Sequence, residues 1–116
     1  MSDLFTLELE VREDVVVARL SGELDVTGSD HAGELLAGGV RTSARGLLVD
    51  LSELAFIDSS GVAMLFALAR RLHGRRQALR VVARPGTTVE RVLEIVELRR
   101  AAPVLGGLEE ALADMG

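Results

Sequence analysis

The sequence contains no cysteine and no lysine among its 116 residues. Without cysteine the chain cannot form disulfides, thiolate metal sites or a thiol nucleophile. Without lysine it cannot form a P-loop, a Schiff base or a lysine general base. These two absences exclude several large classes of enzyme before any motif is considered.

Aromatic residues and excess positive charge are also scarce. The chain has no tyrosine and no tryptophan, and its only aromatic side chains besides histidine are those of three phenylalanines. Aromatic side chains that could stack on bases are therefore few, and the formal net charge is −5. We therefore expect no direct contact with nucleic acid.

Long apolar runs are absent as well. None approaches the roughly 18 residues that a membrane-spanning helix needs, and no cationic leader precedes an apolar segment. Hydrophobic residues make up 48% of the chain and charged residues 27%, a composition typical of a folded domain. We expect one domain over residues 1–116 in a soluble, cytoplasmic protein that has no membrane partner.

The first quarter of the chain reads as a β-hairpin. Residues 5–11 alternate apolar and polar side chains, and residues 15–20 are rich in β-branched residues, with a turn signal at Glu13-Asp14 between them. The stretch 21–25 contains breakers and is expected to end the second strand.

A helix is predicted from about Asp30 to Val40. Thr27 or Ser29 is the expected cap of this helix. Its spacing predicts that Leu35, Leu36 and Val40 face inward.

The central third of the chain predicts a strand, a helix and a second strand. Gly46–Leu51 is nearly all apolar, as in a strand buried on both faces, and the strand 79–83 follows a helix from Ser59 or Ser60 to about His73. This spacing predicts a right-handed crossover between parallel strands. The residues of this helix expected to form its core stripe are Val62, Leu65, Phe66, Ala69 and Leu72.

The remainder of the chain adds three smaller elements. A helix is expected after residues 85–88, a short edge strand at Val104-Leu105 and a last helix over residues 107–115. In the first of these helices the residues expected to face inward are Val89, Val92, Leu93 and Val96. The fold class is therefore α/β, with a mixed sheet and helices packed on it.

The stretch Asp58-Ser59-Ser60-Gly61 lies where an expected strand-loop meets an expected helix N-terminus. Backbone N–H groups at that end are unsatisfied, and the helix dipole favours negative charge there. The stretch could therefore cap the helix, hold an anion or carry a phosphate. Three consecutive hydrogen-bonding side chains exceed what a cap requires.

Other candidate catalytic groups lack a necessary part. Asp50 lacks the acidic pair and the lysine that a phospho-accepting aspartate needs, so we expect it to be a solvated or capping residue at a strand end. A serine hydrolase would need a glycine two residues before Ser59, where Ile57 stands instead. His73 lies about 20 Å along the helix from Ser59, and His31 cannot be placed from the sequence. We expect no catalytic residue, no metal site and no cofactor.

The helix that follows Ser60 is apolar nearly all round. Ala63, Met64 and Ala67 lie away from its main stripe. They form either a second core layer or a binding surface, and the two alternatives are about equally supported.

Three segments in register make the chain resemble the STAS domain, and specifically the bacterial anti-sigma factor antagonists. The segments are Gly22-Glu23-Leu24-Asp25, Leu48-Val49-Asp50-Leu51-Ser52 and Phe56-Ile57-Asp58-Ser59-Ser60-Gly61. The resemblance covers almost the whole chain. It implies a single STAS-like domain in which a mixed sheet has helices packed mainly on one face.

The resemblance also implies a regulator that exchanges partners. Such antagonists bind an anti-sigma factor with serine kinase activity and free the sigma factor. Phosphorylation of a serine at the helix start, here Ser59, ends binding, and a serine phosphatase resets the protein. Together with the outer helix face, this predicts a partner-binding surface formed by Asp25, Asp58, Ser60, Gly61, Ala63 and Met64.

Several alternatives remain open. The chain could be a non-catalytic STAS subunit of a stressosome or of a lipid-transport complex. It could also be a small-molecule or nucleotide-binding STAS module, although it lacks the lysine and the glycine-rich loop that would strengthen an anion site. An enzyme is the least supported class. A monomer or a weak dimer is expected.

Overall fold

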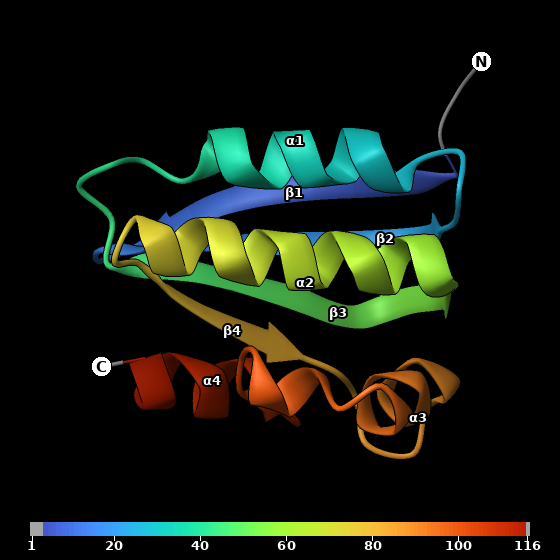
Figure 1. The fold of residues 1–116 in the computed structure, drawn as a ribbon. Coiled ribbons are helices and arrows are strands. Elements are labelled where there is room, and N and C mark those ends of the chain that lie inside the picture. The colour runs from blue at the N-terminus through green and yellow to red at the C-terminus, as the bar shows by residue number, and fades with distance from the viewer. Residues whose placement is uncertain (1–3, 116) are drawn as a thin grey trace.

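A five-stranded mixed sheet organises residues 4–115, which are the residues that the computed structural model describes (Figure 1). Strands follow one another across the sheet in sequence order, with β1 antiparallel to β2 and all later neighbours parallel. The strands are β1 (Phe5–Arg12), β2 (Val15–Leu24), β3 (Gly46–Ile57), β4 (Ala78–Val82) and β5 (Val104–Leu105).

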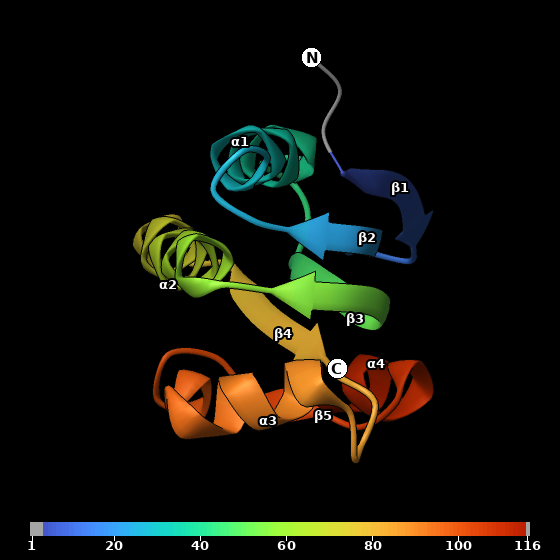
Figure 2. The same cartoon turned by 90° about the vertical axis from the view of Figure 1, so that its right-hand side faces the viewer.

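Helices α1, α2 and α3 cover one face of this sheet, and α4 covers part of the other (Figure 2). The helices are α1 (Ser29–Gly39), α2 (Ser59–Gly74), α3 (Thr88–Ile95) and α4 (Leu108–Met115), and a 3₁₀ turn, η1 (Leu98–Arg100), follows α3. The main core lies between the sheet and the first three helices, and a small second core lies beneath α4. The predicted α/β fold with helices mainly on one face is confirmed.

The predicted hairpin is also confirmed. β1 and β2 pair without interruption from Phe5 opposite Gly22 to Arg12 opposite Val15. Glu13 adopts a left-handed conformation (φ 55°) in the turn between them.

The first half of β3 is buried on both faces, as its composition predicts. All six residues from Gly46 to Leu51 are buried. Leu47 and Val49 belong to the main core, whereas Leu48 belongs to the small core beneath α4. This double coverage explains why this stretch lacks the alternation of a half-exposed strand.

Both central strands are longer than predicted. β2 continues through the breakers to Leu24, and β3 continues to Ile57. The register between them shifts on either side of Gly22, whose backbone is left-handed (φ 94°). A Cβ at Gly22 would lie 2.2 Å from the carbonyl oxygen of Leu4, so the glycine permits a bulge and a close strand approach. The expectation that residues 21–25 end the strand is wrong for this reason.

Helix α1 differs from its prediction in its cap and in one core position. Its N-cap is Gly28, and no side chain caps this end, so neither Thr27 nor Ser29 acts as a cap. Leu36 and Val40 are buried as expected, but Leu35 is 40% exposed. Leu35 points away from the core because α1 packs against it through Ala32, Leu36 and Ala37.

Helix α2 spans nearly the predicted residues and buries a wider stripe than predicted. Val62, Leu65, Ala69 and Leu72 are buried, whereas Phe66 is only half-buried. Met64 and Leu68 are also buried, because α1 packs beside α2 and covers a second face of it.

The C-terminal half follows its predictions closely. β4 begins and ends one residue earlier than expected, and Thr87 caps α3 by accepting a hydrogen bond from the Glu90 N–H (3.2 Å). Val89 and Leu93 are buried, while the other two predicted core positions of this helix are half-buried. The short strand β5 and the last helix are both present.

Candidate functional site: the N-terminal end of helix α2

Two aspartates lie close together at the carboxyl ends of the central strands. Leu24 and Ile57 end β2 and β3 and are paired in register, and the next residues, Asp25 and Asp58, enter the following loops. The Asp58 N–H donates to the Leu24 carbonyl oxygen (3.1 Å), which extends the pairing past the strand ends. Because the two strands are parallel, both carboxylates lie beside the N-terminal end of α2.

Asp58 is the N-cap of α2. Its backbone is extended (φ −108°, ψ −170°), and its Oδ1 accepts hydrogen bonds from the N–H groups of Ser60 (2.8 Å) and Gly61 (3.2 Å). The carboxylate also places negative charge at the positive end of the helix dipole. Ser60 is half-buried and takes part through its backbone, so its side chain is not the cap.

Ser59 is the first residue of α2, and its side chain is exposed. Within residues 4–115 no protein group hydrogen-bonds to its hydroxyl. Since Asp58 already satisfies the first helical N–H groups, the Ser59 hydroxyl has no structural task at this position.

Gly61 allows α2 to approach the sheet. The residue is buried, and a Cβ at this position would lie 2.6 Å from Ile57 Cγ1 and 3.1 Å from the carbonyl oxygen of Leu24. The glycine thus holds the helix start against the ends of β2 and β3. Its predicted role in partner binding can only be indirect, through the position of Ser59.

Asp25 organises the loop between β2 and α1. Its Oδ1 accepts hydrogen bonds from the N–H groups of Thr27 (3.0 Å) and Gly28 (3.3 Å). Its carbonyl oxygen accepts from the Ser29 hydroxyl (2.7 Å) and the Ser29 N–H (3.0 Å). Asp25 is half-buried, so part of its surface faces solvent beside Asp58.

The outer face of α2 carries Ser59 and Ala63 but not Met64. Ala63 and Ala67 are exposed at helical spacing from Ser59 and continue one line along the helix. Met64 is 8% exposed and belongs to the main core, where it contacts α1 at Gly33. The expectation that Met64 lies on a partner-binding surface is wrong, because α1 covers it.

A shallow groove of about 120 Å³ separates the two helices. Met64, Ala67 and Leu68 form apolar parts of its lining, and Asp30 and Glu34 add negative charge. Arg71 lies 3.5 Å from Glu34 and partly neutralises that rim.

Sequence reasoning missed two exposed apolar side chains near this end. Val26 is 76% exposed in the loop that Asp25 organises, and Phe56 is 45% exposed two residues before Asp58. Phe56 could have been found, because aromatic residues are rare in this chain and this one lies only two residues before the cap.

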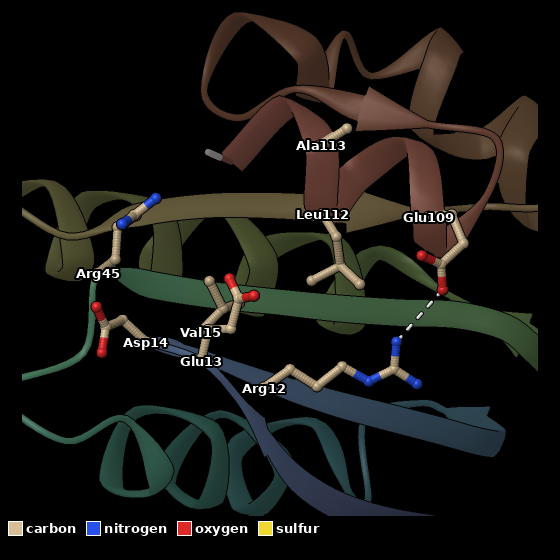
Figure 3. A pocket seen from close by; sticks show the side chains of 8 residues that line it. All are labelled: Arg12, Glu13, Asp14, Val15, Arg45, Glu109, Leu112 and Ala113. Atoms are coloured by element: carbon tan, nitrogen blue, oxygen red, sulfur yellow. Dashed lines mark hydrogen bonds and ion pairs between the residues drawn. The ribbon is translucent and has the colours of Figure 1, made fainter.

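A larger hollow of about 580 Å³ lies at the opposite end of the sheet (Figure 3). Arg12, Arg45 and Glu109 are among its lining residues, together with the acidic turn 13–14. Its lining carries more carboxylates than guanidinium groups and lies far along the strands from Ser59.

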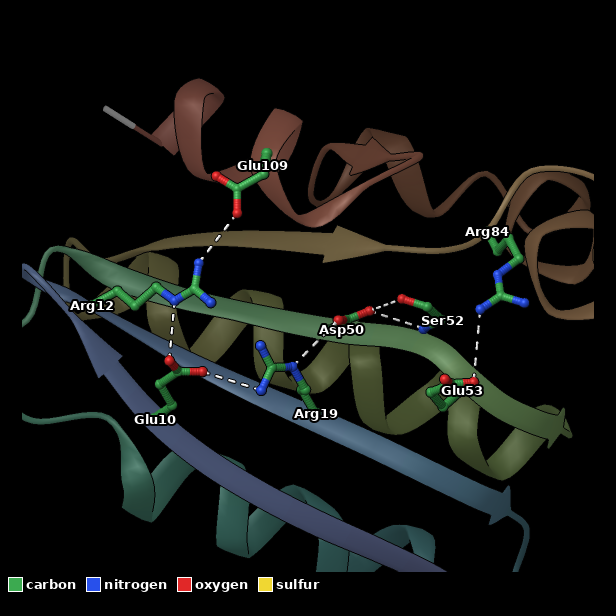
Figure 4. Close-up of polar contacts among 8 residues, drawn as sticks. All are labelled: Glu10, Arg12, Arg19, Asp50, Ser52, Glu53, Arg84 and Glu109. Carbon is green, nitrogen blue, oxygen red and sulfur yellow. Dashed lines mark hydrogen bonds and ion pairs between the residues drawn. The ribbon is translucent and has the colours of Figure 1, made fainter.

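Polar residues on the α4 side of the sheet form a connected network (Figure 4). Glu10 lies 3.1 Å from Arg12 and 3.2 Å from Arg19, and Arg12 also reaches Glu109 (3.3 Å). The hydrogen bond from Arg12, with the charges of both arginines, holds the pKa of Glu10 below its usual value.

Asp50 is also part of this network and does not lie at a strand end. It is 8% exposed in the middle of β3, accepts hydrogen bonds from the Ser52 N–H (2.9 Å) and the Ser52 hydroxyl, and lies 3.9 Å from Arg19. The expectation of a solvated aspartate at a strand end is wrong, because β3 continues beyond it.

Within residues 4–115 neither histidine hydrogen-bonds to Ser59. His73 lies in the last turn of α2, and the His31 ring lies 6.1 Å from the Phe5 ring on the β1 side of α1. Residues 4–115 contain no group of three histidine or acidic side chains placed to hold a metal ion. No helix in the same range has both the length and the apolar character needed to cross a membrane.

The STAS domain model matches residues 6–111, which is nearly the whole chain. The chain belongs to the STAS domain family. An anti-sigma factor antagonist from Mycobacterium paratuberculosis is similar in structure, with a TM-score of 0.85 and 28% sequence identity over 96% of this chain and 93% of that one.

Two structures of SpoIIAA share the fold of this STAS domain. The anti-sigma factor antagonist SpoIIAA in its unphosphorylated form matches with a TM-score of 0.69 and 23% identity, over 94% of this chain and 96% of that one. The Bacillus SpoIIAA in its phosphorylated form matches with a TM-score of 0.65 and 24% identity, over 96% and 100%.

Proposed function

We propose that this STAS protein is an anti-sigma factor antagonist controlled by phosphorylation of Ser59. In the unmodified state it binds an anti-sigma factor that is also a serine kinase, and so releases the sigma factor. The kinase transfers phosphate to Ser59, binding is lost, and a serine phosphatase restores the hydroxyl. The observation that carries the proposal is the exposed, uncommitted hydroxyl of Ser59 on a helix start that Asp58 already caps.

The surroundings of Ser59 support a binding surface. Val26 directly follows Asp25 and Phe56 lies two residues before Asp58, and both are exposed apolar side chains; Ala63 leaves room for a partner along the outer face of α2. Asp25 and Asp58 frame the hydroxyl with negative charge. The similarity to the mycobacterial antagonist, at 28% identity along most of the chain, supports the same class of partner.

Electrostatics explain how one phosphate would end binding without unfolding the domain. The group adds about −1.5 to −2 charges at a helix N-terminus, where the dipole tolerates them. The same charges lie beside Asp25 and Asp58 in the middle of the proposed interface. A partner that fits the unmodified surface would have to bury this unpaired charge, which is strongly unfavourable.

The test is a pair of Ser59 variants with a candidate anti-sigma kinase and ATP. Wild type should gain the mass of one phosphate, mapped to Ser59, whereas Ser59→Ala should gain none and should stay bound. Ser59→Asp should fold normally and bind at least ~10-fold more weakly, although one carboxylate carries less charge than a phosphate. Calorimetric titration and circular dichroism measure the two properties separately.

Ser60→Ala is the matched control, because it removes the neighbouring hydroxyl and leaves the Asp58 cap intact. It should gain one phosphate as wild type does, and that phosphate should map to Ser59. Phosphate mapped to Ser60, or equal affinity of wild type and Ser59→Asp, would contradict the proposal.

We also propose that the protein has no catalytic activity of its own. Cysteine and lysine nucleophiles are lacking, and within residues 4–115 neither histidine hydrogen-bonds to the Ser59 hydroxyl as a general base would. A panel of nucleotide and ester substrates tests this directly. Turnover that disappears in Ser59→Ala or Asp25→Ala would instead indicate an enzyme.

A further inference from the structure

Strand β1 leaves a long, regular edge of the sheet open. Within residues 4–115 it pairs only with β2, and its eight residues contain neither a proline nor a register shift. The opposite edge strand, β5, has only two residues. A long regular edge presents unpaired backbone groups that another strand can complete, whereas a very short edge does not.

An apolar strip runs beside this open edge. Leu9 is 48% exposed and Val11 is 52% exposed on the face of β1 that bears α1. Leu35 of α1 is 40% exposed and lies one helical turn from Gly39, where an added Cβ would lie 2.9 Å from Leu9 Cδ1. The strip therefore spans a strand and a helix next to backbone groups that can pair.

We propose that β1 pairs antiparallel with β1 of a second copy of this chain, with the two-fold axis at Leu9. In this register Leu9 lies opposite Leu9 and Leu7 lies opposite Val11, so these apolar side chains meet on one face, while Phe5 lies at the end of the pairing, opposite Glu13 of the turn. Registers shifted by one residue place apolar side chains opposite charged or polar ones and are unfavourable.

Two neighbouring registers, with the two-fold axis at Glu8 or at Glu10, also place the apolar face of one β1 beside that of the other. Charge favours the Leu9 axis over both. With the axis at Leu9, Glu8 lies opposite Glu10, whose charge is already compensated by Arg12 and Arg19. An axis at Glu8 would also match the apolar side chains, with Phe5 opposite Val11 and Leu7 opposite Leu9, but it would bring two copies of Glu8 together, and Glu8 has no ion pair within residues 4–115. An axis at Glu10 would bring two copies of Glu10 together and would shorten the pairing, since Leu7 would already lie opposite Glu13 of the turn.

The resulting dimer is weak and leaves the Ser59 ends free. One strand pair and its apolar strip bury less than the roughly 1,200 Å² of the smallest standard interfaces. Each copy carries a net charge of −5, so added salt strengthens association by screening the repulsion. Because the strands pair antiparallel, the two Ser59 ends point in opposite directions and can each bind a partner.

Sedimentation of the full chain from micromolar to millimolar concentration tests the dimer. Wild type should show a reversible monomer–dimer equilibrium that shifts toward the dimer in high salt. Leu9→Arg should weaken it by at least ~10-fold, since it buries two like charges at the axis. Ile95→Arg is the matched control, because Ile95 is 69% exposed on α3 away from β1, and it should leave the equilibrium unchanged.

Glu8→Arg tests the register. It places a cation opposite the partner's Glu10 and should tighten the dimer a few-fold, whereas an axis at Glu10 would place it opposite Arg12 and weaken it. If Leu9→Arg does not fold, Val11→Arg replaces it, and slower hydrogen exchange of β1 amides at high wild-type concentration gives an independent readout. A monomer at every concentration and salt, or an equal loss with Ile95→Arg, would overturn the proposal.

Discussion

At the scale of single residues, three residues at the start of α2 have separate roles. Asp58 satisfies the helix N-terminus, Gly61 lets the helix touch the sheet, and Ser59 stays exposed with its hydroxyl uncommitted. Because the structural tasks belong to Asp58 and Gly61, Ser59 can change its charge without removing a contact that the fold needs.

Gly61→Ala should lower the free energy of unfolding by about 2 kcal/mol or more, because the new Cβ would overlap Ile57 and the Leu24 backbone. The shortest contact would be with Ile57 Cγ1 (2.6 Å), and the Ile57 side chain is branched at Cβ and buried, so it has little room to rotate away. Urea denaturation measures the change.

Gly38→Ala is the control for that substitution. Gly38 lies in α1, and a Cβ there would meet nothing within 4 Å. The same chemical change should therefore stabilise the protein by about 0.5–1 kcal/mol. A loss of stability equal to that of Gly61→Ala would show that the close helix–sheet contact is not the cause.

Asp58→Ala should cost about 1 kcal/mol of stability, since it removes the side chain that accepts two helical N–H groups. Ser60→Ala should change stability by less than about 0.5 kcal/mol, because only its backbone contributes to the cap. Thermal unfolding of the two variants separates them. Equal losses would assign the cap to both side chains.

At the scale of elements, α2 has two apolar sides with different purposes. One side packs on the sheet and on α1, and it includes Met64. The other runs from Ser59 through Ala63 and Ala67 and faces solvent. A helix wheel shows that both sides are apolar, but only the position of α1 shows which of them is covered.

Met64→Glu should therefore destabilise the fold by about 3 kcal/mol, because it buries a carboxylate against α1 without a partner. Met64→Leu keeps the volume and should cost less than about 1.5 kcal/mol. Ala63→Arg should leave stability within about 0.5 kcal/mol and should weaken binding to the anti-sigma kinase. Urea denaturation and calorimetric titration test these variants, and normal stability of Met64→Glu would contradict the assignment.

At the scale of the whole molecule, the two ends of the sheet differ. One end carries the aspartates and Ser59. Toward the other end, Glu10, Arg12 and Glu109 connect β1 to α4 across the polar face of the sheet. This connection ties the edge strand to the last helix, elements that lie far apart in the sequence.

The lowered pKa of Glu10 gives this network a pH dependence. A carboxyl group whose pKa is lower in the folded state stabilises the fold above its unfolded pKa, and the contribution is lost as pH falls through the folded value. Arg12→Gln should raise the pKa of Glu10, and the stability difference from wild type should be largest near neutral pH and vanish in acid. Carboxyl NMR titration and urea denaturation at several pH values measure both effects.

Arg100→Gln is the control for this titration. It removes an exposed pair with Glu97 (3.8 Å) outside the network and should leave the pKa of Glu10 unchanged. If the Glu10 pKa stays the same in Arg12→Gln, the network is not what lowers it.

Local patterns in the sequence were enough to predict the elements that depend on neighbouring residues. The hairpin, the doubly buried start of β3 and the helix after Asp58 follow from periodicity and turn chemistry, which act over a few residues. The family resemblance also placed Ser59, Asp25 and Asp58 in one region, and in the structure these residues follow the carboxyl ends of the paired strands β2 and β3.

Only the tertiary structure decided which apolar side chains are covered and where strands end. Periodicity predicts that Leu35 faces inward and places Met64 outside the main core stripe of its helix, yet Leu35 is exposed and Met64 is buried, because α1 and α2 pack against each other along one side only. Gly22 looks like a strand terminator, yet contact with the Leu4 backbone makes it a bulge within β2. Burial and strand length depend on residues distant in the sequence, so no local pattern contains them.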